Sequence, residues 1–247
     1  MIGRGVAVRS MQRVVAILEA VAASRGPATA ARVSAETELS ISTVSRIMRD
    51  LAEEQMLDRL DDGSYLLGSR MFKLVRDARE GGDAMATIHR VLAELRDRTG
   101  ETASLHVRRD DTRVCIASVD SRHELRRVVP VGDAIPLVGT ATGHVLMAEL
   151  SAAEQTALID RARATSSRVE LLGRLREAAE NGWAVQADGL ISGVTGVAAP
   201  VRVGGRIVAA VTLSGPTTRM PTEVVEKILP DLEEAARRIE PWVREPS

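Results

Sequence analysis

The first 67 residues contain a succession of patterns that few folds can accommodate. Apolar residues recur at helical spacing in residues 10–24, 30–37 and 41–54, so each stretch predicts a short amphipathic helix. A Gly-Pro pair at 26–27 ends the first of them. Two short runs of alternating apolar and polar residues then flank the sequence DDGS at 61–64, which is typical of a hairpin turn. Three helices followed by a hairpin is the order of a winged helix-turn-helix domain.

Side chains that can accept a hydrogen bond from a free backbone N–H indicate where these helices should begin. Ser10 and Thr29 can cap the first two helices, and a brief break at 38–40 precedes the third. Residues 69–82 predict a further helix that closes this domain. The glycine pair at its end, 81–82, is the best linker candidate in the chain.

The third helix, residues 41–54, has the side chains expected of a helix that reads DNA. One face is apolar and should pack on the other two helices, whereas the opposite face carries hydroxyl groups and arginines with almost no acid. Short hydroxyl side chains can donate to phosphate oxygens, and Arg46 is long enough to reach a phosphate or a guanine edge. The alternative is a solvated helix face in a small all-helical module. Together with the hairpin, the candidate DNA-contacting residues are Ser42, Thr43, Ser45, Arg46, Arg49, Arg59 and Ser64.

The charge distribution favours the same interpretation. The whole chain has a formal net charge of -1, which excludes a generally basic nucleic-acid coat. Residues 1–49, however, contain seven arginines and three glutamates, a net charge of +4. A locally basic segment on a neutral chain suggests a face that meets an anion, although chance could also produce it.

Cysteine usage and hydropathy limit where the protein can act and what chemistry it can do. Cys115 is the single cysteine, so no internal disulfide forms, and the N-terminus has no apolar signal core. No segment approaches the roughly 20 apolar residues of a membrane span. We therefore expect a cytoplasmic protein with no membrane partner. His106, Cys115 and His123 have no metal-ligand spacing, and no nucleophile, base and acid are arranged together, so we expect no metal, no cofactor and no enzyme.

After Gly100 the pattern changes to strands, then helices, then strands again, which predicts an α+β second domain. A glycine-rich stretch at 139–143 should lead into a helix, and Gly204-Gly205 should form a hairpin turn. The expected strands are 102–109, 113–120, 124–131, 183–187, 195–203 and 206–215. Helices are expected at 84–99, 151–164, 168–181 and 221–239. The expected domains are therefore 1–68, a linker helix region at 69–83, and 84–247.

Seven stretches spread over nearly the whole chain resemble one known group, the IclR-family transcriptional regulators. These are SMQRVVAILEAVA, STVSRIMRDLAEEQML, DGSYLLGSRMFKL, TGETASLHV, GDAIPLVGTATGHVLMAEL, NGWAVQADGLISGVTGVAAPV and VAAVTLSGP. The resemblance implies a winged helix-turn-helix domain that binds double-stranded operator DNA, a linker helix and a GAF-like effector-binding domain. It also implies homodimers, often paired into tetramers. Apolar residues of the linker helix region are candidates for the dimer contact: Met71, Phe72, Leu74 and Val75.

The chain departs from the family pattern at five positions. Glu38 stands where the family usually has glycine, and Ile41 where lysine is common. In the second domain His144 replaces a usual lysine, Gly189 a usual acid, and Gly196 a frequent cysteine. The loss of a lysine at Ile41 gives Arg46 and the hairpin a larger share of DNA affinity. Glycine at position 196 removes a polar contact and adds space.

The resemblance also implies an effector pocket where the glycine-rich loop meets the last strands. Carried over by position, its residues are Ala141, Thr142, Gln186, Gly196, Thr212 and Ser214. Backbone N–H groups of the GTATG sequence at a helix start, with these hydroxyl and amide groups, suit a carboxylate. No Lys or Arg belongs to this set, so neutral donors would hold the effector. We expect a small organic acid and favour an aromatic one, because Gly196 widens the site. The alternatives are a DNA-binding scaffold without a ligand and, less favoured, an enzyme on the GAF-like domain.

Overall fold

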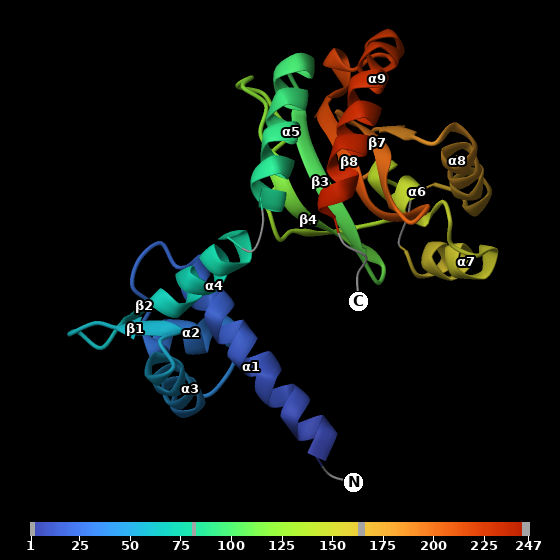
Figure 1. Ribbon diagram of the computed structural model, residues 1–247. Coiled ribbons are helices and arrows are strands. Elements are labelled where there is room, and N and C mark those ends of the chain that lie inside the picture. Colours follow the sequence, from blue (N-terminus) through green and yellow to red (C-terminus); the bar gives the residue numbers. More distant parts are fainter. Residues whose placement is uncertain (1–2, 81–82, 163–165, 244–247) are drawn as a thin grey trace. The chain divides into compact units, whose positions relative to one another are not determined.

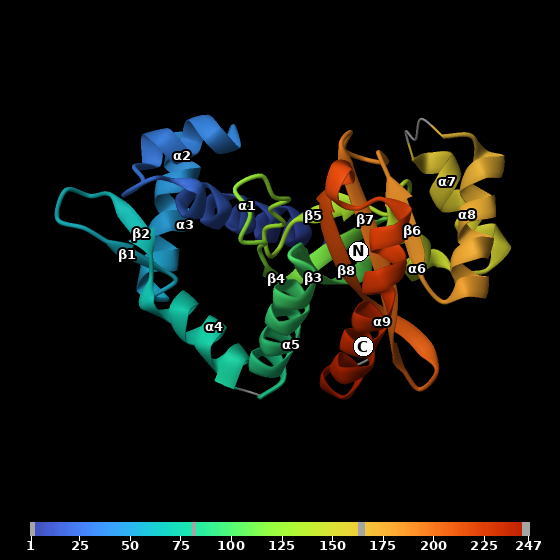
Figure 2. The ribbon, with the colours of Figure 1, turned by 90° about the horizontal axis from the view of Figure 1, so that it is seen from above.

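The computed structural model describes residues 3–80, 83–162 and 166–243, with side chains at 10–74 and from 84 onward within these ranges. The chain divides into two compact units, Met1–Gly82 and Asp83–Ser247. Figures 1 and 2 show both units, and each is described here by itself. The glycine pair 81–82, the expected linker, lies outside the described residues.

The first unit has the element order of a winged helix-turn-helix domain, as predicted. Figure 1 shows the hairpin projecting away from the helices. The elements are α1 (Gly3–Ala23), α2 (Ala30–Thr37), α3 (Ile41–Glu53), β1 (Leu57–Arg59), β2 (Tyr65–Leu67) and α4 (Ser69–Glu80). The prediction that Ser10 caps the first helix is wrong, because α1 begins seven residues earlier, at Gly3. No proline precedes Ser10 to stop the helix, and serine is tolerated inside one.

Hydrogen-bonded caps set the boundaries of the two helices of the helix-turn-helix motif. Thr29 Oγ1 accepts from Arg32 N at 3.3 Å, which confirms Thr29 as the cap of α2. Ser40 Oγ accepts from Thr43 N at 3.4 Å and caps α3. Between them Glu38 ends α2 in the left-handed conformation, with φ 56°. This residue makes the sharp reversal that separates α2 from α3.

Aliphatic side chains from every helix of the motif and from the hairpin form the core of the first unit. Leu57 pairs with Leu67 and Arg59 with Tyr65 in the antiparallel hairpin. Tyr65 also exchanges two backbone hydrogen bonds with Ala28, at 2.8 and 2.9 Å, which attaches the hairpin to the segment before α2. The largest side chains of this core that are fully buried are Ile17, Met48 and Leu57.

The second unit is built on one six-stranded antiparallel sheet with the strand order β5-β4-β3-β8-β7-β6. The strands are β3 (Thr102–Arg109), β4 (Thr112–Val119), β5 (Ala134–Pro136), β6 (Ala184–Ala187), β7 (Val194–Val203) and β8 (Arg206–Pro216). The helices are α5 (Asp83–Thr99), α6 (Ala141–Met147), α7 (Ala152–Arg161), α8 (Arg168–Asn181) and α9 (Thr222–Ile239), with short 3-10 helices at Thr217–Arg219 and Glu240–Trp242. The α+β prediction is confirmed, as is the turn at 204–205, where both glycines have positive φ.

Helices cover the two faces of this sheet unequally. Figure 1 shows α5 and α9 side by side on one face, whereas α6 lies on the other face with α7 and α8 outside it. Strand alternation divides β8 accordingly: Val211 and Leu213 belong to the core under α5 and α9, and Ala210 to the core under α6. On β3, Leu105 likewise lies toward α5 and α9. Polar residues of β3 and β8 therefore gather on the α6 side.

The predicted strand at 124–131 is wrong, and the edge strand β5 lies at Ala134–Pro136 instead. Pro130 has no N–H to donate, and Gly132 turns the chain with φ 95° while its N–H donates to the Cys115 carbonyl at 2.8 Å. Val129 is buried against Cys115 and Ile135. Val129 therefore anchors a loop, whereas Leu125, Val128 and Val131 are exposed.

Candidate functional site

The third helix, α3, presents the two faces that its sequence predicts. Val44, Ile47, Met48 and Leu51 are buried in the core of the first unit. Ser42, Arg46 and Arg49 are exposed, and Thr43 and Ser45 are half-buried. The side chain of Arg46 is 70% exposed, and its closest acidic partner, Asp50, lies 4.0 Å away at the limit of an ion pair. This face offers hydroxyl and guanidinium donors to an outside anion, and their contact with DNA stays a prediction.

The two hairpin residues of the predicted DNA interface differ in their surroundings. Arg59 is exposed at the end of β1. Ser64 is buried, and both its backbone N–H and its hydroxyl donate to Asp62 Oδ1, at 2.9 and 2.5 Å. These bonds lower the pKa of the Asp62 carboxyl. Ser64 therefore stabilises the hairpin turn with both of its donors, and its contact with DNA stays a prediction.

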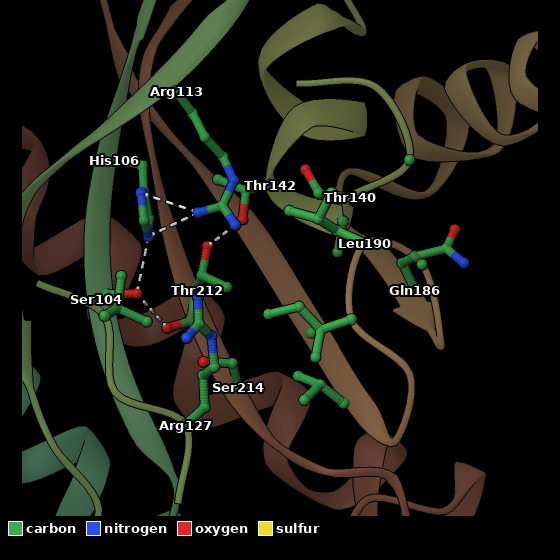
Figure 3. Close-up of a pocket in the computed structure, with 17 residues that line it drawn as sticks. Ser104, His106, Arg113, Arg127, Thr140, Thr142, Gln186, Leu190, Thr212 and Ser214 are labelled. Carbon is green, nitrogen blue, oxygen red and sulfur yellow. Dashed lines mark hydrogen bonds between the residues drawn. The ribbon is translucent and has the colours of Figure 1, made fainter. Parts of the chain in front are cut away.

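A pocket on the α6 side of the second sheet brings together all six residues of the predicted effector site, as Figure 3 shows in part. The space between its lining residues that no atom fills is about 520 Å³, including the part open to solvent. Four elements contribute these residues: Ala141 and Thr142 from α6, Gln186 from β6, Gly196 from β7, and Thr212 and Ser214 from β8. Sequence reasoning therefore found one wall of a real pocket.

The same pocket contains charged and polar residues that sequence reasoning missed. Arg113 from β4 and Arg127 from the loop after β4 both line it, with Ser104 and His106 from β3. The expectation that no arginine belongs to the site is therefore wrong. His106 lies between Leu105 and Val107 in a strand sequence, which was an available signal. Arg113 begins the predicted strand 113–120, and Arg127 lies in the segment that was mistaken for a strand.

Hydrogen bonds connect several of these side chains across the pocket (Figure 3). Thr142 Oγ1 lies 2.8 Å from Thr212 Oγ1, and Ser104 Oγ lies 2.9 Å from His106 Nε2. Arg113 Nη1 lies 3.0 and 3.1 Å from the two ring nitrogens of His106. Two buried polar atoms, Ser214 Oγ and Arg113 Nε, have no hydrogen-bond partner among the described residues. Such atoms are costly unless something else satisfies them, for example a ligand or water.

The pocket is cationic. Burial lowers the pKa of His106 well below its ordinary value, and the charges of Arg113 and Arg127 lower it further, so the imidazole is neutral at pH 7. Burial and the charge of Arg127 lower the pKa of Arg113 to about 10, which still leaves the guanidinium charged. No Asp or Glu lies among the residues that line this pocket. The described site therefore has positive charge without a protein counter-ion.

Two of the predicted neutral donor groups already have hydrogen-bond partners within the protein. Gln186 Nε2 donates to the Ala187 carbonyl at 2.8 Å, so its amide is already engaged. Thr140 caps α6 and accepts the Gly143 N–H at 3.0 Å, which occupies part of the predicted N–H cradle. A Cβ added at Gly196 would lie 3.8 Å from Ala141 Cβ, an ordinary contact. Glycine at this position therefore leaves room for roughly one methyl group.

The described residues contain no group of three or more His, Cys, Asp or Glu side chains that could hold a metal ion. Burial raises the pKa of the Cys115 thiol to about 11, so the group is a protonated and inert core side chain. Within the described part of the chain, no helix is both long and apolar enough to cross a membrane.

Two family models match this chain in the order of its two units. The IclR helix-turn-helix domain matches residues 10–61, and the C-terminal domain of the bacterial transcriptional regulator IclR matches residues 80–241. The chain belongs to the IclR family of transcriptional regulators. This family consists of DNA-binding transcriptional regulators and not of enzymes, so the chain is a DNA-binding transcriptional regulator.

Family relatives match over most of their lengths. The probable transcriptional regulator SauR of Cupriavidus necator is 29% identical over 229 residues, covering 89% of this chain and 91% of SauR. The transcriptional repressor IclR of Escherichia coli is 24% identical over 243 residues, covering 94% of this chain and 89% of that repressor. An IclR homolog from Microbacterium hydrocarbonoxydans, solved in complex with 4-hydroxybenzoate, shares the fold with a TM-score of 0.77 at 24% identity, covering 94% of this chain and 98% of that one.

Proposed function

We propose that this family member changes its occupancy of operator DNA when a small organic acid binds the pocket of its second unit. The observation that carries the proposal is a pocket with two arginines, no carboxylate, and two buried polar atoms without partners, Ser214 Oγ and Arg113 Nε. Buried charges and donors of this kind are stabilised by an anion that supplies charge and hydrogen-bond acceptors together. A carboxylate is the common metabolite group that fits.

The comparison with the Microbacterium hydrocarbonoxydans protein supports the ligand class and not the particular ligand. Its complex contains 4-hydroxybenzoate, an organic acid with an apolar ring. The pocket of this chain also combines charged donors with apolar side chains, namely Val129, Leu190, Ile191 and Val194. An acid with a hydrocarbon body therefore suits both halves of the lining.

On the DNA side, the proposed reading element is α3 inserted in the major groove. Ser42, Thr43 and Ser45 would contact phosphates, and Arg46 and Arg49 would reach phosphates or base edges. Arg59 in the hairpin would contact the backbone beside the groove. Because the proposed target is operator DNA, the proposed place of action is the cytoplasm.

A homodimer, with tetramers as a further step, completes the proposal. Phe72 and Leu74 on α4 are 65% and 52% exposed, and Met11 and Val15 lie exposed four residues apart on α1. Large apolar side chains at this exposure are typical of a surface that meets a partner. Met71 is half-buried, and the side chain of Val75 lies outside the described residues.

Light scattering measures the oligomeric state. The mass should be twice the 26.5 kDa of the chain or a multiple of that value, and Phe72→Ser should lower the measured mass. A wild-type monomer with intact DNA binding would contradict the dimer.

The experiment that tests the function uses the full chain and a labelled fragment from upstream of its own gene. Fluorescence anisotropy gives the operator affinity alone and with each member of a panel of organic acids. At least one acid should change this affinity about 5- to 150-fold, the usual range of allosteric coupling. Specific operator binding that no acid changes would contradict effector modulation, and absence of specific binding would contradict the DNA interface.

A further inference from the structure

The pocket holds two cationic side chains that approach each other without an acid between them. Figure 3 shows Arg113 and Arg127 reaching into the site from opposite sides of Ser104 and Thr212. The two charges are close enough for Arg127 to disfavour the protonated form of Arg113. Among the described residues, neither guanidinium has an ion pair with a carboxylate, whereas most other arginines of the second unit do have one.

Arg113 is held through its side chain, and Arg127 through its backbone, by bonds to other elements. Arg113 lies in β4 and contacts both ring nitrogens of His106. The loop that carries Arg127 is fixed at its backbone, because Thr102 Oγ1 donates to the Arg127 carbonyl at 2.6 Å. The carbonyl of Leu125, two residues before Arg127, accepts a hydrogen bond from the Arg219 side chain at 3.0 Å. Arg219 is itself paired with the buried carboxylate of Glu101 through two hydrogen bonds.

This arrangement keeps two like charges together, which destabilises the empty pocket. A ligand with one negative charge would leave the site with one uncompensated cation. A ligand with two negative charges would neutralise both, and each guanidinium could form charge-assisted hydrogen bonds to its own acidic group. Ser214 Oγ and the hydroxyl groups of Thr142 and Thr212 add neutral donors beside them.

We propose that the effector carries two anionic groups, one for Arg113 and one for Arg127, as a short dicarboxylic acid does. The carbon body between them would lie against the apolar wall formed by Leu190, Ile191 and Val194. This inference rests on the proposed function, because it specifies the acid that the pocket binds. It differs from a pocket in which both arginines hold a single carboxylate.

Calorimetry on the full chain separates these two arrangements with matched ligands. Butanoate is compared with butanedioate, hexanoate with hexanedioate, and benzoate with benzene-1,4-dicarboxylate, at a pH where every carboxyl group is ionised. In at least one pair the diacid should bind at least about tenfold more tightly than the monoacid, as expected for one added charged hydrogen bond.

Three variants assign that preference to residues. Arg113→Gln and Arg127→Gln should each reduce the advantage of the diacid to less than about threefold while monoacid binding remains measurable. The matched control is Arg126→Gln. Arg126 is the exposed neighbour of Arg127 and does not line the pocket. Its Nε atom lies 3.8 Å from Asp120 Oδ2, so it already has an acidic partner. Its diacid preference should equal that of the wild type. Circular dichroism confirms that each variant is folded.

The outcomes distinguish this inference from the function on which it rests. Monoacids that bind the wild-type protein as tightly as their matched diacids would overturn the two-anion inference and leave the acid effector intact. A preference that survives in both arginine variants would also overturn it. Failure of every acid in the series and in the wider panel to bind would contradict the proposed function itself. The wild-type comparison decides the matter even if a variant fails to fold.

Discussion

Thr142 Oγ1 and Thr212 Oγ1 lie 2.8 Å apart and join the first turn of α6 to strand β8 inside the pocket. Both hydroxyl groups are buried, and the bond between them uses one of their two O–H donors, so the other stays free for a ligand. The pair therefore contributes to the stability of the second unit as well as to the lining of its pocket. Ser214, two residues further along β8, has a buried hydroxyl with no partner among the described residues.

Thr142→Val should therefore destabilise the protein even without a ligand. The substitution keeps the shape of the side chain but leaves Thr212 Oγ1 buried and unpaired, which costs about 1–3 kcal/mol. Calorimetric unfolding of the second unit measures this. An unchanged unfolding free energy would show that the threonine pair contributes nothing to stability.

Ser214→Ala should have the opposite profile. Because Ser214 Oγ has no described partner to lose, the free energy of unfolding should stay constant or rise slightly. Affinity for a bound acid should fall by about 0.5–1.5 kcal/mol, since one donor is removed. Calorimetric titration with the strongest acid of the panel, done on the same preparation, checks the second part. Wild-type affinity in this variant would exclude Ser214 from the ligand contacts.

His144 should make the second unit sensitive to acid. Burial and the charge of Arg174 lower the pKa of His144 to about 4, and neither ring nitrogen has a partner in the described structure. The unfolded chain therefore binds more protons than the folded one between about pH 6.5 and 4, and stability is lost as pH falls through this window. From pH 7.5 to 5 the loss from this residue should be about 2 kcal/mol.

His144→Leu is the variant that tests this dependence. Leucine has a similar volume, so it should raise the midpoint of thermal unfolding at pH 5 more than at pH 7.5. Differential scanning calorimetry at both pH values gives the comparison. Part of the pH dependence should persist, because the pKa of buried His106 is lowered too. Equal shifts at the two pH values would contradict a neutral buried His144.

Glu38→Gly should stabilise the first unit. Glu38 ends α2 with φ 56°, a left-handed conformation that costs a side chain energy and that glycine adopts freely. The expected gain is about 0.5–1 kcal/mol. Glu36→Gly is the control, since residue 36 is inside α2, where glycine should destabilise by about 1 kcal/mol. The same sign of change in both variants would contradict this explanation.

Arg46→Ala should weaken operator binding by about 1–3 kcal/mol if Arg46 contacts a base, with little effect on folding. The matched control is Arg174→Ala, since Arg174 also pairs with an acid four residues away on a helix, but in the second unit. Anisotropy at several salt concentrations measures both variants. Unchanged affinity and an unchanged salt slope for Arg46→Ala would remove this residue from the interface.

Local patterns predicted the elements whose boundaries are set locally. Helix α3 has an apolar face at Val44, Ile47, Met48 and Leu51, and the hairpin turn at 61–64 contains the residues that such turns require. These features depend on neighbours in the sequence. The segment 124–131 has a strand-like composition, but residues far away in the sequence fix its course. The Thr102 hydroxyl donates a hydrogen bond to the Arg127 carbonyl, and the Gly132 N–H donates one to the Cys115 carbonyl.

The candidate site shows the same division. Thr142, Thr212 and Ser214 were found through their place in family motifs. Arg113 and His106 were not, because strand alternation does not tell which face of a sheet meets a pocket, and β3 and β4 shift register between Leu105 and His106. Arg127 depends on the loop path. The charge of the pocket, on which the proposed ligand class depends, therefore emerged only from the assembled fold.

The reciprocal titration tests the central claim most directly. The affinity of the strongest acid is measured by calorimetry on the full chain, once alone and once with a saturating operator fragment. If acid and operator are coupled, the ratio of the two acid affinities must equal the ratio of operator affinities with and without acid, about 5- to 150-fold. An acid affinity that the operator leaves unchanged would contradict the account, however tightly the acid binds.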